Sequence, residues 1–294
     1  GGSLLKDCYA AYARYFVRFI EAYRDEGIPI YAVTPQNEIH YAPPQYSGMM
    51  MTSAEEASFI GRYLGPALES AGLNVKIFCY DHNWDYPDIP AKTLSDPEAA
   101  KYLAGSAWHY YAGNPRVMTD MHKRFPDKGI WFTEGGSGKW IGKGTFAGTF
   151  KDGIANAIDI CSNWSKSFIW WNIALDQDNG PIVFPNTANY GLVAVQVDRD
   201  TGKGALIRPE RASFYTLAHF SKFVRPGAVR IASTGKGLDL SSVAFKNPDG
   251  SIVAVLYNRF SYPAELSLKC GGRYFHLALP ELSAATVVWD KAHP

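Results

Sequence analysis

Two glutamates stand where buried strands are predicted to end. Glu134 closes residues 129–134, a segment rich in apolar and β-favouring side chains that is followed by two glycines, and Glu38 follows the apolar residues 28–34. Carboxyl groups at the carboxyl ends of parallel strands usually face a pocket, because an unpaired carboxylate inside a strand is costly to bury. Such a pair can cleave a glycosidic bond. One carboxyl protonates the leaving oxygen, and the other attacks the anomeric carbon or activates water.

Side chains near these two positions suit a sugar substrate. Asn37 directly precedes Glu38, and its amide can hydrogen-bond a sugar hydroxyl beside the reacting carbon. Aromatic faces pack against the C–H faces of pyranose rings. The candidate platforms near other strand ends are Trp84, Trp140, Trp170 and Trp171. The simpler alternative is that the two glutamates form structural salt bridges or helix caps.

Strand and helix patterns alternate through the first two hundred residues. Apolar residues at three- and four-residue steps predict a helix over 4–26 that Gly27 ends. Ser53 and Glu56 predict a capping box for a helix that runs to about residue 71. The predicted strands cover residues 28–34, 75–80, 105–111, 129–134 and 167–174. This alternation predicts a parallel sheet covered by helices, with fewer strands than the eight of a closed barrel.

The pattern changes after a helix predicted for residues 209–223. From residue 227 onward, short alternating segments are separated by turns such as residues 247–250. They predict an antiparallel β-sandwich. We therefore expect a partial (β/α) barrel over residues 1–223 and a β-sandwich side domain over residues 224–294.

Composition excludes several functions. The 294 residues carry a net charge of +1, so no basic surface for nucleic acid is expected, and no apolar run is long enough to cross a bilayer. The four cysteines lack CxxC spacing and the seven histidines lack HExxH spacing. We expect a mechanism with no metal and no cofactor. A secreted or periplasmic location is expected ahead of a cytoplasmic one.

Five motifs occur in order along the chain. Residues 31–38 read YAVTPQNE, 108–111 read WHYY, 131–134 read WFTE, 171–176 read WNIALD ahead of Gly180-Pro181, and 219–228 read HFSKFVRPGA. Together they resemble glycoside hydrolase family 30, the glucosylceramidase-like retaining β-glycosidases. The resemblance implies a TIM-type (β/α)8 barrel that here lacks its first three strands, plus the β-sandwich.

The resemblance also implies roles for the two glutamates. Glu38 corresponds to the general acid/base and Glu134 to the nucleophile. A retaining pair lies about 5–5.5 Å apart, with the nucleophile ionised and the acid protonated at rest. The implied substrate is a β-glucoside, and a β-1,6-glucan or a β-xyloside is the alternative. In another class of function, the chain is a non-catalytic carbohydrate-binding or complementing fragment.

Further site residues follow from the same resemblance. His109 and Tyr111 are expected near the nucleophile, with Trp171 and Asn186 around the cleaved sugar. His109 could instead be a buried histidine that backbone groups satisfy. Trp171 could instead belong to the core, since its neighbour Trp170 must point the opposite way. The open edges of a partial barrel favour pairing with a second copy, so a homodimer is a further expectation.

Overall fold

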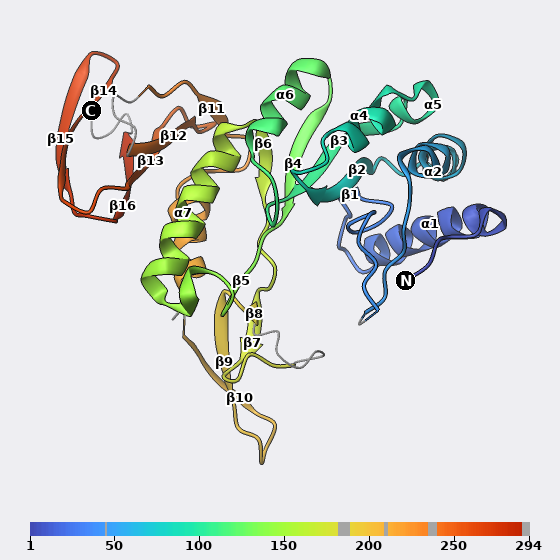
Figure 1. The fold of residues 1–294 in the computed structure, drawn as a ribbon, viewed down its shortest axis with the longest axis horizontal. Helices are drawn as coiled ribbons and strands as arrows, with labels where there is room; N and C mark the ends of the chain where they lie inside the picture. Colours follow the sequence, from blue (N-terminus) through green and yellow to red (C-terminus); the bar gives the residue numbers. More distant parts are fainter. Residues whose placement is uncertain (45, 182–188, 209–210, 235–239, 290–294) are drawn as a thin grey trace. The chain divides into compact units, whose positions relative to one another are not determined.

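The chain folds into two compact units. A computed structural model describes all residues except 45, 182–188, 209–210, 235–239 and 290–294 (Figure 1). Unit 1 comprises Gly1–Gly135 and Asn163–Ile169, and unit 2 comprises Gly136–Ser162 and Trp170–Pro294.

A parallel five-stranded sheet forms the centre of unit 1. Its strands are β1 (Ala32–Val33), β2 (Lys76–Asn83), β3 (Leu103–His109), β4 (Gly129–Glu134) and β6 (Ser165–Phe168), in the order β1-β2-β3-β4-β6. This confirms the predicted parallel sheet of a partial barrel. Because all five strands run the same way, their carboxyl ends lie along one edge, where the candidate glutamates are expected.

Helices accompany these strands in unit 1. They are η1 (Lys6–Cys8), α1 (Tyr9–Asp25), α2 (Ser53–Phe59), the π-helical η2 (Ile60–Leu64), α3 (Gly65–Ser70), α4 (Asp88–Ser95), α5 (Pro97–Ala100) and α6 (Arg116–Arg124). The first predicted helix is confirmed by α1. It buries Tyr9, Ala13, Phe16 and Ile20 on one face, and Gly27 follows with a φ of +78°.

The capping box of α2 lies one residue before the predicted position. The Thr52 side chain accepts a hydrogen bond from the Glu55 backbone at 3.2 Å, and the Glu55 carboxylate accepts from the Thr52 backbone at 2.8 Å. The assignment to Ser53 and Glu56 is therefore wrong. Residues 52–55 read Thr-x-x-Glu and residues 53–56 read Ser-x-x-Glu, so the sequence allows both registers. In the register that begins at Thr52, Glu56 is free to be fully buried.

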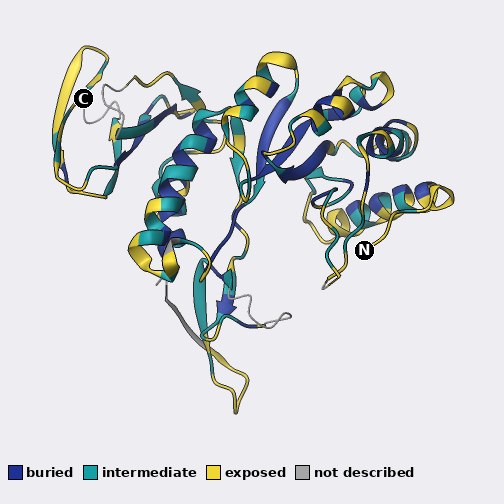
Figure 2. Ribbon diagram, viewed as in Figure 1, coloured by how far each residue is buried: buried dark blue, intermediate teal, exposed yellow. Residues whose placement is uncertain are grey.

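The core of unit 1 lies around its three long strands, whose ribbons are mostly buried in Figure 2. Phe78 of β2 stacks on Trp131 of β4 with ring centroids 3.9 Å apart. The backbones of β3 and β4 approach closely near these rings. A Cβ on Gly105 of β3 would lie 1.8 Å from the carbonyl oxygen of Gly129 in β4. Glycine at position 105 therefore allows the close approach of β3 and β4.

Among its described residues, unit 2 contains three antiparallel sheets, a mixed sheet in which β7 runs parallel to β9, and two longer helices. Its helices are η3 (Gly142–Gly144), α7 (Phe146–Ser162) and α8 (Ala212–Ser221). Its strands are β5 (Ser137–Gly138), β7 (Ala174–Asp176), β8 (Asn189–Tyr190), β9 (Val193–Val197), β10 (Gly204–Arg208), β11 (Val229–Ile231), β12 (Leu240–Lys246), β13 (Ile252–Asn258), β14 (Ala264–Cys270), β15 (Arg273–Leu279) and β16 (Ala284–Trp289).

The C-terminal strands bear out the predicted antiparallel structure. β11, β12, β13 and β16 form one sheet in that order, and β14 pairs with β15 in a separate two-stranded ribbon. The pairing of β9 with β10 was not expected from the sequence. The domain boundary after residue 223 stays a prediction. Within unit 2, α7 packs with α8 and also contacts β12 and β13.

None of the helices in the described part of the chain combines the length and apolar character that a membrane span requires.

Candidate active site

Both candidate glutamates lie at the carboxyl edge of the parallel sheet in unit 1. Glu134 is the last residue of β4, and its side chain is 24% exposed. Glu38 follows β1 and is buried, with a φ of 49°. Its backbone N–H donates to the carbonyl oxygen of Asp81 at 2.8 Å. This bond fixes the loop after β1 to the end of β2.

His109, the last residue of β3, contacts both glutamates. Its Nδ1 lies 2.9 Å from Glu38 Oε1, and its Nε2 lies 3.9 Å from Glu134 Oε2. The same Nε2 forms a hydrogen bond of 3.0 Å with Asp81 Oδ1. The ring is buried, and carboxylates rather than backbone groups satisfy it. One imidazole therefore joins the two carboxyl groups that the sequence singled out.

Asp81 is the residue of this site that sequence reasoning missed. Besides His109, its carboxylate accepts hydrogen bonds from Thr133 Oγ1 at 2.6 Å and from Thr34 Oγ1 at 2.7 Å. Thr133 directly precedes Glu134. Asp81 thus connects the ends of β1, β2, β3 and β4. We refer to Glu38, Asp81, His109 and Glu134 as the carboxylate–histidine cluster.

Two further side chains contact the cluster. Tyr111 donates its hydroxyl hydrogen to Glu134 Oε1 at 3.0 Å. His82 Nδ1 lies 3.5 Å from Glu38 Oε1, which is longer than a typical hydrogen bond. His82 follows Asp81 directly, and both side chains are buried.

The cluster holds its proton on the histidine. Burial opposes a charged ring, but the hydrogen bonds to Asp81 and Glu38 outweigh it and raise the pKa of His109 to about 10. Burial would also raise the pKa of Glu38, yet the contacts with His109 and His82 lower it to about 2. Glu38 is therefore an ionised acceptor, and the proton between the two groups is on Nδ1.

Glu134 has the opposite shift. Burial raises the pKa of Glu134, and the nearby positive charge of His109 and the hydrogen bond from Tyr111 counter only part of this effect. The expected resting state had Glu134 ionised and Glu38 protonated. The unliganded cluster instead favours ionisation of Glu38, because the imidazolium hydrogen-bonds Glu38 directly and lies farther from Glu134.

The residue types at this site include metal ligands. Glu38, His82 and His109 bring one potential ligand atom each within 4.8 Å of one another. A metal would need an unprotonated ring nitrogen on His109. With a pKa of about 10, both ring nitrogens carry hydrogens at neutral pH and point them at Glu38 and Asp81. Hydrogen bonds to these two carboxylates thus engage both ring nitrogens of His109.

A pocket opens beside Asn37 in unit 1. It has a volume of about 340 Å³, and its lining includes Asn37, Gln36, Tyr12, Tyr41 and Tyr46. Burial, with smaller effects from Tyr41 and Glu38, raises the pKa of Tyr46 to about 12. The Tyr46 phenol therefore stays neutral, and Asn37 is exposed where it can meet a ligand. The sugar contact predicted for Asn37 stays a prediction.

The tryptophan candidates divide into exposed and buried rings. Trp171 is 44% exposed while Trp170 is buried, so Trp171 is not the core residue of the two. Trp140 is also exposed, whereas Trp84 is buried and therefore not a sugar platform. Asn186 lies outside the described residues.

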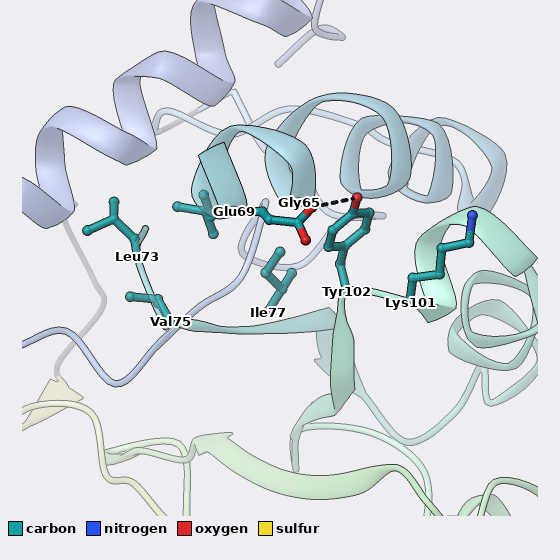
Figure 3. A pocket seen from close by; sticks show the side chains of 8 residues that line it. Gly65, Glu69, Leu73, Val75, Ile77, Lys101 and Tyr102 are labelled. Carbon is teal, nitrogen blue, oxygen red and sulfur yellow. Dashed lines mark hydrogen bonds between the residues drawn. The ribbon is translucent and has the colours of Figure 1, made fainter. Parts of the chain in front are cut away.

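A second pocket of unit 1 lies at the opposite edge of the sheet (Figure 3). Its volume is about 400 Å³, and Val75, Ile77 and Tyr102 line it near the amino ends of β2 and β3. Tyr102 donates a hydrogen bond to Glu69 at 3.3 Å across it. Because catalytic groups of parallel β/α domains gather at the carboxyl ends of strands, this pocket is not the active site.

A parallel β/α sheet whose carboxyl edge carries two carboxyl groups close to one histidine is typical of barrel-type hydrolases. Comparison with known proteins then identifies the family. The Glycosyl hydrolase family 30 TIM-barrel domain matches residues 2–224, and the Glycosyl hydrolase family 30 beta sandwich domain matches residues 227–287. The chain belongs to glycoside hydrolase family 30.

Individual relatives agree with this assignment. Putative glucosylceramidase 4 of Caenorhabditis elegans is 31% identical over 98% of this chain and 56% of its own length. Endo-1,6-beta-D-glucanase neg1 of Aspergillus fumigatus is 32% identical over 99% of this chain and 58% of its own length. The solved endo-beta1,6-glucanase BT3312 is 35% identical, with a TM-score of 0.87 over 98% of this chain and 65% of the solved one. The chain thus spans less than two thirds of each.

Proposed function

We propose that this chain carries the catalytic machinery of a retaining β-glycosidase, with Glu134 as the nucleophile and Glu38 as the general acid/base. The observation that carries the proposal is His109, which contacts both carboxyl groups at the carboxyl edge of the sheet. Carboxyl groups so close to one ring can act on the two sides of one glycosidic bond.

The reaction has two steps. In the first, Glu134 attacks the anomeric carbon, the glycosidic C–O bond breaks, and Glu38 gives a proton to the leaving oxygen. In the second, Glu38 removes a proton from water, the water oxygen bonds to the anomeric carbon, and the ester bond to Glu134 breaks. Glu134 accepts a hydrogen bond from the Tyr111 hydroxyl, and the charge of the His109 ring lies nearby, with Nε2 at 3.9 Å from Glu134 Oε2.

The first step needs a proton that Glu38 does not hold at rest. Its source in this proposal is His109, whose Nδ1 lies 2.9 Å from Glu38 Oε1. The proton passes to Glu38 as negative charge develops on the leaving oxygen, and Asp81 stabilises the ring from the other side. Glu38 and His109 therefore act as one acid with a shared proton.

A mechanism-based 2-fluoro β-glucoside tests the assignment directly. The expected result is a stable covalent adduct seen in the intact mass, which peptide mapping locates on Glu134. The variant E134Q should not be labelled, and its kcat for an aryl β-glycoside should fall on the order of 10⁴-fold. A label on Glu38 would exchange the two roles, and no label on a folded chain would support the non-catalytic, carbohydrate-binding alternative.

The proposed substrate is a β-glucoside, with a β-1,6-glucan as the second candidate. The glucosylceramidase and endo-1,6-glucanase names of the relatives support both. A β-xyloside has weaker support, since the solved xylanase C of Talaromyces cellulolyticus is 26% identical with a TM-score of 0.75, against 35% and 0.87 for the solved glucanase. Comparing kcat/KM for aryl β-glucoside and aryl β-xyloside, together with reducing ends released from β-1,6-glucan, separates the three.

A homodimer is a further proposal. β1 and β6 are the outer strands of the parallel sheet in unit 1, and exposed strand edges pair readily with another chain. The mass in solution tests this: twice the chain mass of 32.5 kDa supports the dimer. A monomer across micromolar concentrations contradicts it.

A further inference from the structure

β2 is irregular where it enters the carboxylate–histidine cluster. Tyr80 pairs with Ala107 of β3 and His82 pairs with the next residue, Trp108, so Asp81 is the extra residue of a bulge. Tyr80 has a φ of 79° and Asp81 a φ of 50°. Non-glycine residues rarely adopt this left-handed region, and they persist there only where the surroundings hold them.

The bulge directs two consecutive side chains to one place. In a regular strand, successive side chains point to opposite faces of the sheet. Here Asp81 Oδ1 lies 3.0 Å from His109 Nε2, while His82 Nδ1 lies 3.5 Å from Glu38 Oε1. The cluster therefore depends on the left-handed backbone at Tyr80 and Asp81.

Glu56 of α2 holds the start of this bulge. Its side chain is fully buried. Its Oε1 accepts the Tyr80 backbone N–H at 2.7 Å, and its Oε2 accepts the Thr93 hydroxyl of α4 at 2.8 Å. A carboxyl oxygen that accepts this N–H satisfies a buried donor that would otherwise be costly to leave unpaired.

Burying a carboxyl group here is expensive. Burial raises the pKa of Glu56 to about 7, although both hydrogen bonds lower it. A leucine of similar volume would pack between α2, α4 and β2 without this cost. Leucine would lack acceptors for the Tyr80 N–H and for the Thr93 hydroxyl. The hydroxyl has another acceptor, the Ile89 carbonyl at 3.4 Å, so binding the Tyr80 N–H is the function that distinguishes glutamate at this position.

We infer that Glu56 is a positioning residue of the active site: by binding the Tyr80 N–H it holds the Tyr80–Asp81 bulge and so places Asp81 and His82 against His109 and Glu38. This inference rests on the proposed glycosidase function only for its kinetic consequences. Glu56 acts through the backbone, since its two hydrogen bonds reach Tyr80 and Thr93 rather than a group of the cluster.

Three variants separate positioning from packing. E56Q keeps an acceptor for the Tyr80 N–H, and its amide can donate to Thr93, whose hydroxyl then turns to the Ile89 carbonyl at 3.4 Å. E56L has no acceptor. T93V is the matched control, because it removes the other hydrogen bond of Glu56 and leaves the contact with Tyr80 intact.

The kinetic readout is the kcat for an aryl β-glucoside across pH. E56L should lower kcat about 100-fold, the loss expected when catalytic groups are misplaced by about 1 Å. Its alkaline limb should also move to lower pH, because a displaced Asp81 no longer supports the imidazolium of His109. E56Q and T93V should retain the wild-type pH profile. A folded E56L with that same profile would overturn the inference.

A second readout does not require catalysis. The ring nitrogens of His109 can be titrated by ¹⁵N NMR in the free protein, where wild type should keep its imidazolium to a pH of about 10. The titration should move down by more than one pH unit in E56L and stay in place in T93V. If E56L does not fold, E56D provides the comparison, since its shorter side chain retains the charge but withdraws from Tyr80. An unshifted His109 in folded E56D would likewise contradict the inference, whether or not the wild type is active.

Discussion

His109 Nδ1 lies 2.9 Å from Glu38 Oε1, and this contact gives the two residues one shared proton. The pKa of His109 rises to about 10 and that of Glu38 falls to about 2. The ring is therefore the proton donor of the pair at neutral pH. The other ring nitrogen, Nε2, forms its hydrogen bond with Asp81. The acceptor for the Nδ1 proton is therefore Glu38.

Replacing His109 tests whether its ring supplies the proton to Glu38. H109Q removes the cation, so the Glu38 carboxyl loses the partner that holds its pKa low and must carry its own proton. Activity of the wild type should fall as pH rises through about 10. In H109Q the alkaline limb of kcat/KM should move down by about 2 pH units or more, with a loss of about 100-fold in kcat. H122Q is the control. His122 of α6 stacks on Trp164, and its replacement should leave the alkaline limb in place.

Tyr111 should influence the ionisation of Glu134, the proposed nucleophile. Y111F removes the hydroxyl that donates to Glu134 at 3.0 Å, and a hydrogen bond to a charged group is worth about 1.5–3 kcal/mol. The pKa of Glu134, already raised by burial, should rise further. Activity requires the ionised form, so the acidic limb should move to higher pH and kcat/KM should fall about tenfold. Y102F removes a tyrosine hydroxyl at the opposite edge of the sheet and should change neither quantity.

Asp81 should control how stability depends on pH. A pKa raised in the folded state contributes stability that is complete below the unfolded value of about 6.5 and is lost as pH rises to about 10. D81N removes one of the carboxylates that raise the pKa of His109. It should lower the free energy of unfolding by about 3 kcal/mol near pH 6, and its alkaline loss should be smaller and end at a lower pH than in the wild type. Urea unfolding from pH 6 to pH 10 measures both, and parallel curves for the two proteins would refute the role of Asp81.

The capping box of α2 offers a test of register. T52A removes the side chain that accepts from the Glu55 backbone, and should lower the free energy of unfolding by about 1 kcal/mol. S53A, one residue later, should change it by only a few tenths of a kcal/mol. A larger loss in S53A than in T52A would show that the helix begins in the register predicted from the sequence.

Much of the fold was predictable from local patterns. The strands ending at Glu134 and His109 stand out because apolar, β-favouring residues precede polar ones, and the hydrophobic spacing of α1 is unambiguous. Both glutamates were found in this way. An acidic residue at the end of an apolar, β-favouring segment can be recognised in a single sequence, without any alignment.

The remaining features depend on long-range geometry. Asp81 and His82 are consecutive, so a regular strand would direct only one of them to the site, and no residue type announces a left-handed tyrosine at position 80. Glu56 was interpreted as a helix cap because its partner, the Tyr80 N–H, is 24 residues away. Likewise, adjacent tryptophans left open which of Trp170 and Trp171 is exposed.

The carboxylate–histidine cluster holds three carboxyl groups, Glu38, Asp81 and Glu134, around one imidazolium, that of His109. Whenever the carboxyl groups are ionised, negative charge is in excess. Positive charge develops on the sugar during glycoside cleavage, so this excess favours the transition state over the neutral substrate. A sugar mimic with a basic ring nitrogen would carry such a charge permanently. The cluster should therefore select protonated iminosugars over neutral analogues of the same shape, and should do so more strongly as Glu134 becomes ionised.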